Sequence, residues 1–389
     1  MAKSAGKFKK VVVMKKFKIA LVHDFLIDFG GAERVLCALK EIYPQAPVFV
    51  SIYKPELLGE FKNKFKDWEI KTSWFQKIPG AEKLISPFRF LLPLIWESFD
   101  FSGFDLVISS SSWAMPKGII TSPETLHLCY CHTPPRYLYG YPTARPWQKY
   151  WLVRVYTKLV NGFMKKYDWA SSARVDYFIA NSKEVQGRIK RFYQRDSIVI
   201  NPPVEIPKKL KKVKLKKDAP YFFASRLASP KNHDLAVKAC GELKRSLLVA
   251  GDGPLRGEIE KLVAQYPTVK YLGRITDKKL GELYRQCRAV IFPVIEEDFG
   301  IVPLEANAYG KPVIALFSGG AKETVKERET GMFFKKPTVN SLKKAILKFE
   351  KKEKSFEPEV MKEWAKGFSK SRFKREIKDF VYSHSRGGL

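Results

Sequence analysis

The sequence predicts an α/β fold built from two doubly wound parallel-sheet domains. Short apolar runs that end in Gly, Asp, Ser or Asn alternate with longer stretches of helical spacing, as parallel strands alternate with crossover helices. The pattern occurs twice, and the charged, proline-flanked stretch EIPKKLKKVKLKKDAP separates the two halves. A chain of 389 residues is also long enough for two domains. We therefore expect two Rossmann-like domains that face each other across a cleft.

Each half contains a series of predicted strands. In the first half they are KIALVHDFL, PVFVSIY, FDLVISSSS, LHLCYCHT, YFIANS and SIVINPPV. In the second half they are YFFASRL, SLLVAGDG, VKYLGRI, AVIFPVI and KPVIALF. The expected organisation is a basic disordered tail (1–16), a first domain (17–204), a linker (205–218), a second domain (219–366) and a final helical segment (367–389). Because parallel sheets bind ligands beyond the carboxyl ends of their strands, we expect the functional residues just after these runs.

The charge of the chain is its one unusual compositional feature. Lys and Arg number 71 against 40 Asp and Glu, which leaves a net charge of +31. Such a surplus attracts nucleic acid, acidic lipid headgroups or phosphorylated substrates, although a lysine-rich solubilising surface explains it equally well. The chain has no recognisable RNA-binding module or basic helix with interleaved aromatics, so we do not expect a nucleic-acid partner.

The five cysteines are odd in number and lie scattered through apolar segments. This pattern is typical of reduced thiols in a cytoplasmic protein. Cys129, Cys131 and His132 lie close together, but no second Cys or His pair completes a zinc site, and we expect no metal.

A glycine pair follows the first predicted strand. Gly30 and Gly31 precede a helix in FLIDFGGAERVLCAL, where small residues let backbone amides approach a phosphate and the helix dipole favours the anion. A glycine turn with a purely structural role explains the pair equally well.

Two cations open the second half. Arg226 and Lys231 lie between a predicted strand and a helix in FFASRLASPKNHDLAVKA. Cations placed there suit a diphosphate, which must be held and which gains charge as it leaves. In isolation, a solvated pair in a lysine-rich protein is the simpler interpretation.

The most specific segment is AVIFPVIEEDFGIVPLEANAYGKPVIALFSGGAKETV. Glu297 lies in an acidic loop after a strand, and Glu305 lies eight residues later in a helix. Two carboxylates so placed can accept bidentate hydrogen bonds from vicinal hydroxyls at two points along one ligand. Glu296 is the neighbouring candidate, and only the eight-residue spacing to Glu305 selects Glu297.

This string resembles the sugar-donor signature of retaining GT-B glycosyltransferases of family GT4, with its Glu-x7-Glu element. GDGP and LGRITDKKLGELY resemble neighbouring segments of that family. In the first half, HDFLIDFGGAERV, FDLVISSSSWAMPKG, CYCHTPPRYLYG and FIANSKEVQGRIKRFY resemble the acceptor domain of bacterial members that build polysaccharides and lipid-linked glycans, many of them mannosyltransferases. The resemblance covers nearly the whole chain.

The resemblance implies a role for each matching position. Arg226 and Lys231 would bind the diphosphate, Glu297 the transferred sugar, and Glu305 the ribose hydroxyls. His132, at a strand end before Thr133, would approach the sugar from the first domain, although a lone His is more often structural. The implied catalytic residues are His132, Glu297, Arg226 and Lys231. The implied residues around the sugar donor are Gly30, Gly31, Arg274, Ile275, Phe299, Gly300, Ile301, Val302 and Glu305.

The resemblance also implies a reaction. A hexose, with mannose preferred, would pass with retention from a nucleotide-diphosphate sugar, with GDP-mannose preferred, to a glycan or lipid-linked acceptor. The sequence has no Asp-x-Asp, which favours a metal-independent enzyme without a cofactor. An epimerase or a phosphorylase of the same architecture remains an alternative, and a nucleic-acid-binding protein is a less favoured one.

Two further segments yield expectations. Residues 84–99, LISPFRFLLPLIWESF, are rich in Leu, Phe and Trp in a basic chain. They form either a contact with an anionic membrane surface on its cytoplasmic side or a buried element under the acceptor cleft. Near the carboxyl end, Phe373, Ile377, Phe380 and Val381 have helical spacing, and we expect this helix to cross back to the first domain.

Overall fold

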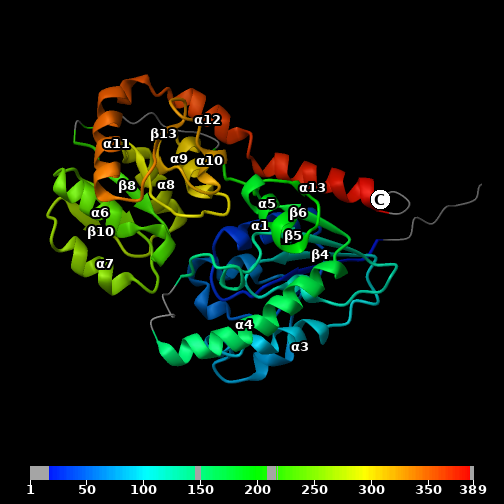
Figure 1. The fold of residues 1–389 in the computed structure, drawn as a ribbon. Coiled ribbons are helices and arrows are strands. Elements are labelled where there is room, and N and C mark those ends of the chain that lie inside the picture. The colour runs from blue at the N-terminus through cyan, green and yellow to red at the C-terminus, as the bar shows by residue number, and fades with distance from the viewer. Residues whose placement is uncertain (1–16, 145–149, 208–215, 217, 386–389) are drawn as a thin grey trace, which may run out of the picture.

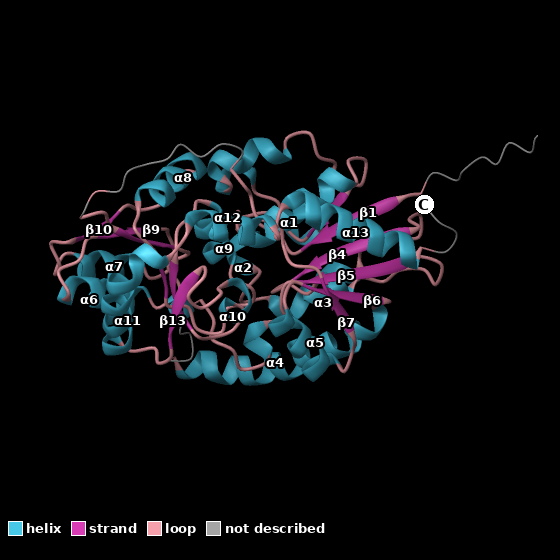
Figure 2. Ribbon diagram, turned by 90° about the horizontal axis from the view of Figure 1, so that it is seen from above, coloured by secondary structure: helices cyan, strands magenta, loops and turns pink. Residues whose placement is uncertain are grey.

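The computed structural model describes residues 17–144, 150–207, 216 and 218–385. The predicted tail (1–16), most of the predicted linker (208–215 and 217) and residues 386–389 lie outside the described residues. The predicted fold class is confirmed, because the chain forms two parallel sheets with helices on their faces (Figure 1). Figure 2 shows the sheets at opposite ends of the molecule, with α1, α9 and α10 between them.

The first sheet has seven strands in the order β3-β2-β1-β4-β5-β6-β7. Its strands are β1 (Ile19–His23), β2 (Val48–Val50), β3 (Ile70–Thr72), β4 (Leu106–Ser111), β5 (Leu126–Cys131), β6 (Tyr177–Ala180) and β7 (Ser197–Val199). Every residue of β4 is buried, as expected for a central strand covered on both faces. The strand order reverses between β1 and β4, where His23 pairs with Ser110 in the register. Ligands bind at such a reversal in open α/β sheets.

The second sheet has six strands in the order β10-β9-β8-β11-β12-β13. Its strands are β8 (Tyr221–Ala224), β9 (Leu247–Ala250), β10 (Val269–Tyr271), β11 (Val290–Phe292), β12 (Val313–Leu316) and β13 (Gly331–Phe334). The order reverses between β8 and β11. The two sheets thus repeat the same winding, and each has its own reversal point.

Two strands were not among those expected. β3 is short and its side chains are largely exposed, so the sequence lacks the apolar run of a buried strand. β13 has the sequence GMFF inside a charged stretch. Both lie at sheet edges. β13 is mostly buried, but its apolar run is too short between charged neighbours to be distinctive in the sequence.

The helices cover both faces of the sheets. They are α1 (Gly31–Ile42), α2 (Ala81–Leu84), α3 (Leu92–Glu97), α4 (Trp151–Ser171), α5 (Lys183–Tyr193), α6 (His233–Glu242), α7 (Arg256–Val263), α8 (Asp277–Gln286), α9 (Ile301–Ala308), α10 (Ala321–Thr324), α11 (Val339–Lys352), α12 (Pro358–Lys366) and α13 (Lys370–His384). Side-chain caps fix several of the starts. Ser182, Thr276, Thr338 and Ser369 each accept a hydrogen bond from an amide of the first turn.

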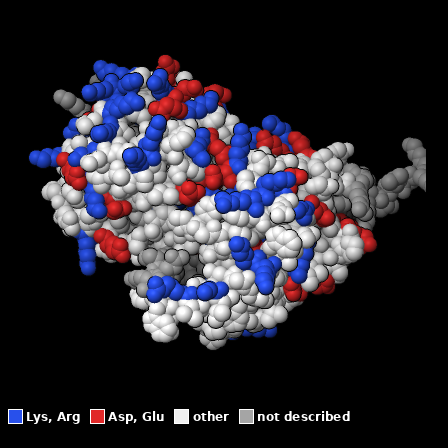
Figure 3. All heavy atoms as spheres, in the orientation of Figure 1, with Lys and Arg blue, Asp and Glu red and all other residues white. Residues whose placement is uncertain are grey.

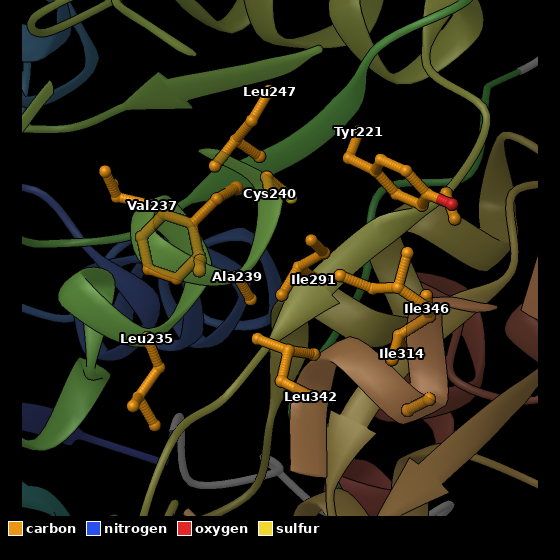
Figure 4. Packing of buried hydrophobic residues seen from close by; sticks show 14 of the residues in the cluster. Tyr221, Leu235, Val237, Ala239, Cys240, Leu247, Ile291, Ile314, Leu342 and Ile346 are labelled. Atoms are coloured by element: carbon orange, nitrogen blue, oxygen red, sulfur yellow. The ribbon is translucent and has the colours of Figure 1, made fainter. Parts of the chain in front are cut away.

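The core of the second domain lies between its sheet and helices α6 and α11. Figure 4 shows Ala239 of α6 and Leu342 of α11 beside Ile291 of the sheet, and Leu235 of α6 lies further away in the same cluster. The last helix, α13, joins the other core. Phe373 and Ile377 of α13 are buried in a cluster with Leu21 and Ile108 of the first sheet. Figure 1 shows α13 leaving the second domain and running along the first.

A buried ion pair attaches α4 to the first domain. Nζ of Lys117 lies 3.0 Å from Oδ1 of Asp168, and the two side chains are 1% and 0% exposed. Tyr139 and Tyr193 donate hydrogen bonds to the two oxygens of the same carboxylate, at 2.7 and 3.2 Å. Ser171 accepts a hydrogen bond from Lys117. The carboxylate and the ammonium are therefore both paired, which a buried charge requires.

Residues 84–99, expected either to contact a membrane or to be buried under the cleft, are partly buried and partly exposed. Ile85, Leu92, Ile95 and Trp96 are buried in the first domain, as a structural element would be. Three other apolar side chains of the segment are exposed, namely Phe88, Phe90 and Leu94. The segment is mainly a core element, and its apolar content does not by itself indicate a membrane.

A buried histidine makes the stability of the first domain pH-dependent. His127 in β5 hydrogen-bonds Ser109 and the carbonyl oxygen of Arg174, and burial lowers its pKa to about 4. The unfolded chain protonates this ring near pH 6.5. It therefore binds more protons than the folded chain between these values, and the free energy of unfolding falls as the pH is lowered from about 6.5 to about 4. The loss from this ring amounts to about 3 kcal/mol.

Urea unfolding at a series of pH values checks this expectation. The variant His127→Gln keeps hydrogen-bonding groups but cannot take up a proton, so its stability should depend less steeply on pH in this interval. An equal slope for the variant and the wild type would contradict it.

Candidate active site

The residues after β8 and after β11 meet at the reversal point of the second sheet. Lys231 lies in the turn before α6, and Glu297 lies in the loop after β11. Nζ of Lys231 is 2.5 Å from Oε2 of Glu297, and both side chains are partly buried. Asn232 donates a hydrogen bond to the carbonyl oxygen of Pro293 at 2.8 Å, which ties the two loops together. Two predicted site residues are therefore in direct contact.

The acidic loop (296–298) is held closely against the turn before α10. A Cβ atom on Gly319 would lie 2.4 Å from the carbonyl oxygen of Glu297, so only glycine fits there. Glu296 has a φ of 52°, in the left-handed region, and its carboxylate lies 3.7 Å from Nη2 of Arg188 in the first domain. Glu297, rather than Glu296, is therefore the glutamate beside Lys231.

The start of α9 touches the glycine pair of the first domain. Gly300 has a φ of 93° and precedes the helix, and Ile301 and Val302 are half-buried in its first turn. A Cβ atom on Gly31 would lie 2.9 Å from Cδ1 of Ile301. The absence of a side chain at Gly31 thus permits this approach between the domains. Phe299 is buried in a small cluster with Phe368.

Glu305 lies one turn further along α9. Tyr284 donates a hydrogen bond to Oε2 of Glu305 at 3.0 Å. Burial raises the pKa of Glu305, whereas the charge of Arg34 in α1 opposes that rise. Arg34 also pairs with Asp277 of the second domain at 2.9 Å. Glu305 is therefore a carboxylate at the interface, beside a cation from the opposite domain.

Arg226 and Arg274 both approach the loop that leads to the glycine pair. A guanidinium nitrogen of each lies 4.0 Å from a carboxylate oxygen of Asp28. Arg226 and Arg274 are 63% and 50% exposed, so both are open to solvent and to a ligand. Ile275, beside Arg274, is partly buried against another apolar cluster of the second domain, which includes Leu283 of α8. Asp28 was not predicted, because an exposed acidic loop residue has no distinctive sequence signal.

His132 belongs to a chain of buried hydrogen bonds. Its Nε2 lies 2.8 Å from Oγ of Ser110, which lies 3.0 Å from Nδ1 of His23. Nε2 of His23 is 3.4 Å from Glu33, whose other oxygen accepts a 2.7 Å hydrogen bond from the amide of Gly30. The chain links His132 to the glycine pair. Sequence analysis missed Ser110, His23 and Glu33, which come together only because β1 and β4 are neighbours in the sheet.

One of the proton arrangements that satisfy every member of this chain has a neutral His23 ring. His132 donates through Nε2 to Ser110, Ser110 donates to Nδ1 of His23, and His23 donates through Nε2 to Glu33. Burial and the neighbouring His23 lower the pKa of His132 to about 3, so its ring is neutral at pH 7. Burial alone would raise the pKa of Glu33, but hydrogen bonds from His23 and from backbone amides hold it below its ordinary value. In this arrangement Nδ1 of His132 is a hydrogen-bond acceptor.

Two arginines of the first domain bind the acidic loop of the second. Arg136 donates to the carbonyl oxygen of Glu296 and lies 3.3 Å from Asp298, which also pairs with Arg188. Arg188 donates a further 3.0 Å hydrogen bond to Thr133, next to His132. We call Arg136 and Arg188 the arginine pair. They were not predicted, because CHTPPRY and QGRIKRF show basic residues but not which carboxylates they meet.

The described residues contain no group of three or more His, Cys, Asp and Glu side chains placed to hold a metal ion. Cys37, Cys129, Cys131, Cys240 and Cys287 are all free thiols. Cys129 and Cys131 are buried in the first sheet and pack in a cluster with Phe178 and Val185.

Sequence profiles of known families match both domains. Residues 29–206 match the family described as "Glycosyltransferase Family 4", and residues 205–367 match "Glycosyl transferases group 1". The chain belongs to the family 4 glycosyltransferases. The two matches meet at residues 205–206 and together extend from the glycine pair to the end of α12.

Relatives and solved structures agree with this membership. An uncharacterised glycosyltransferase of Methanocaldococcus jannaschii, MJ1178, is 30% identical over 152 residues, which cover 38% of this family 4 chain and 43% of that protein. The match thus spans less than half of that relative. The alpha-1,3/1,6-mannosyltransferase ALG2 of Kluyveromyces lactis is 24% identical over 370 residues, which cover 79% of this chain and 71% of ALG2.

The solved structure of Anabaena HepE in complex with UDP and glucose has the same fold. It superposes with a TM-score of 0.67 at 18% identity and covers 95% of this chain and 100% of HepE. The predicted GT-B architecture of this family 4 glycosyltransferase is therefore confirmed.

Proposed function

We propose that this chain transfers a hexose, preferably mannose, from a nucleotide-diphosphate sugar to a glycan or lipid-linked acceptor. The observation that carries the proposal is the contact between Lys231 and Glu297 beside α9, whose first residue, Ile301, packs on Gly31 of the opposite domain. A cation and a carboxylate from separate strand ends there suit the two ends of an activated sugar, one anionic and one rich in hydroxyls.

Each charged group has a distinct role in this proposal. Lys231 and the exposed Arg226 bind the diphosphate and stabilise the charge that develops on it. Glu297 and Glu305 accept hydrogen bonds from the sugar and the ribose. The neutral His132 accepts a hydrogen bond from a sugar hydroxyl through Nδ1. Backbone near Arg274 and Ile275 contacts the base, and the amides of residues 299–302 contact the sugar phosphate.

We propose retention of configuration without a metal. The bond between the anomeric carbon and the diphosphate oxygen breaks, and the acceptor oxygen forms a bond to the anomeric carbon on the same face. The acceptor's proton passes to the departing phosphate oxygen, so no protein nucleophile is required. Lys231 and Arg226 supply the positive charge that a metal provides in other sugar transfers.

The preference for mannose draws support from the likeness to the mannosyltransferase ALG2. The nucleotide is less defined, since HepE was solved with UDP, and we propose GDP-mannose as the first sugar donor to test. A lipid-linked acceptor would place the enzyme at the cytoplasmic face of a membrane. The five free thiols are consistent with that reducing compartment.

Replacing Glu305 by alanine tests the site. Two lost hydrogen bonds to the ribose should weaken GDP binding at least about tenfold, since each hydrogen bond to a charged group contributes about 1.5–3 kcal/mol. Isothermal titration of GDP, of UDP and of GDP-mannose, each with EDTA present, measures the change. The matched control is Glu282→Ala, because this glutamate of α8 is partly exposed and pairs only with Lys279 among the described residues. Normal GDP affinity in Glu305→Ala would contradict the assignment.

A product assay separates the alternatives. A transferase forms a glycoside only when an acceptor is present. NMR then gives the anomeric configuration of that glycoside. An epimerase releases free sugar or an epimer without an acceptor, and a phosphorylase needs inorganic phosphate. Release of an epimer in the absence of acceptor would overturn the proposed transfer.

A further inference from the structure

Among the helices in the described part of the chain, α4 carries the most exposed large apolar side chains. Trp151, Leu152, Val155, Leu159 and Phe163 are between 53% and 71% exposed. At about 100° per residue these side chains fall within an arc of about 120°, so they form one stripe along the helix. We call these five residues the α4 stripe. Contiguous apolar surface of this kind marks an interaction site on most soluble proteins.

The stripe is not the face that anchors the helix. Val160, Met164 and Tyr167 lie on a separate face of α4, about 40–100° beyond Phe163 around the helix, and pack in the core cluster of the first domain. Asp168, also on that side, is held by the buried ion pair with Lys117. The helix is therefore fixed by one apolar face and presents a second one outward. Folding of this domain does not require the exposed face to be apolar.

The charges of α4 indicate what covers the stripe. The helix carries the exposed cations Arg154, Lys158, Lys165 and Lys166, and its single acidic residue, Asp168, is buried. At the same spacing of about 100° per residue, Arg154, Lys158 and Lys165 lie along one edge of the stripe as a cationic border, and Lys166 lies within the stripe. Cations beside Trp, Leu and Phe are the pattern of a helix that lies in the interface of an anionic bilayer. In Figure 3 the lower edge, where α4 begins in Figure 1, is white with blue side chains.

A neighbouring segment adds to this surface. Arg89 donates hydrogen bonds to Asn161 of α4 at 3.2 and 2.9 Å, and Tyr156 of α4 donates to the carbonyl oxygen of Pro87. The segment so attached exposes Phe88 and Phe90, at 42% and 38%. None of the helices in the described ranges has the length and apolarity to cross a bilayer.

We propose that the α4 stripe and its cationic border bind the surface of an anionic phospholipid membrane. A second copy of the chain is a poorer occupant. Two α4 helices packed face to face would bring Arg154, Lys158 and Lys165 of each copy together without an exposed carboxylate on either helix to pair them. An anionic headgroup layer supplies the missing negative charge and the apolar layer beneath it. The inference does not depend on the proposed sugar transfer.

Vesicle sedimentation tests the proposal. The full chain is mixed with vesicles of phosphatidylcholine and phosphatidylglycerol, or of phosphatidylcholine alone, at low and high salt. We expect binding to the anionic vesicles that weakens at high salt. The double variant Val155→Glu/Leu159→Glu should bind at least tenfold more weakly and keep the wild-type melting temperature, since both side chains are exposed. The matched control, Leu347→Glu, changes an exposed leucine of α11 and should bind as the wild type does.

Three outcomes would overturn the proposal. They are failure of the wild type to bind anionic vesicles, equal binding by the double variant, and equal loss in the Leu347→Glu control. Light scattering adds a fourth. A dimer that the double variant abolishes, in a protein that ignores vesicles, would assign the stripe to a subunit interface instead. Sugar transfer to a soluble acceptor should be unchanged in the double variant, so failure of membrane binding and failure of the proposed reaction are distinguishable.

Discussion

Replacing Lys231 by alanine is expected to lower turnover at least about tenfold, with a modest change in the free energy of unfolding. The ammonium group lies 2.5 Å from Glu297, and in the proposed complex it turns to the diphosphate, whose charge grows as the sugar departs. Loss of one preorganised cation costs a few kcal/mol of transition-state stabilisation. The measurement is the rate of nucleotide diphosphate release at saturating sugar donor, together with KM.

Lys238→Ala is the matched control for this prediction. Lys238 lies on α6, is 41% exposed and pairs with Asp234 at 3.4 Å. Its loss removes a positive charge from the same domain but should leave turnover unchanged. Wild-type turnover in Lys231→Ala would remove the assignment of Lys231 to the diphosphate. An equal loss in both variants would indicate a general effect of charge.

Replacing Lys117 by methionine should lower the free energy of unfolding by about 3–5 kcal/mol. The change leaves the carboxylate of Asp168 fully buried without its cation, with only the hydroxyl groups of Tyr139 and Tyr193 to stabilise it. Chemical unfolding followed by circular dichroism measures the loss. The double variant Lys117→Met/Asp168→Asn should recover part of it, because a neutral amide needs no counter-charge.

An exposed ion pair supplies the comparison. Lys190 and Asp196 are separated by 2.7 Å, but their side chains are 63% and 93% exposed. Lys190→Met should therefore leave the unfolding midpoint unchanged. If Lys117→Met were equally harmless, the buried pair would not stabilise the attachment of α4. Failure of the double variant to recover any stability would point to lost packing rather than to an unpaired charge.

The central strands were predictable because burial on both faces requires continuous apolar runs. β4 and β5 are read directly from FDLVISSSS and LHLCYCHT. β3 was missed because an exposed edge strand such as IKT carries no such signal. The stripe on α4 was also missed. Its segment has two apolar faces, one packed and one exposed. Residues 84–99 have the denser apolar composition, so the membrane hypothesis was assigned to them instead.

The site, like the strands, was predictable only where the local sequence carries a signal. Lys231 and Glu297 each follow a recognisable strand, and strand ends of one sheet lie near one another, so their contact follows from the predicted fold. Their exact partners do not follow. The hydrogen-bond chain through Ser110 depends on the pairing of β1 with β4, and the arginine pair depends on how the two domains meet. These contacts join residues that are far apart in sequence.

The arginine pair makes the conformation of the acidic loop (296–298) depend on the first domain as well as on its own. Arg136 and Arg188 reach Glu296 and Asp298 from the first domain, while Glu297 between them faces Lys231. Any hinge motion that separates the domains removes the two guanidinium groups from Glu296 and Asp298, whereas Glu297 keeps Lys231 of its own domain. Loop conformation and interdomain angle are therefore thermodynamically linked. In the proposed complex, a substitution at Arg188 should therefore alter the affinity for the nucleotide sugar.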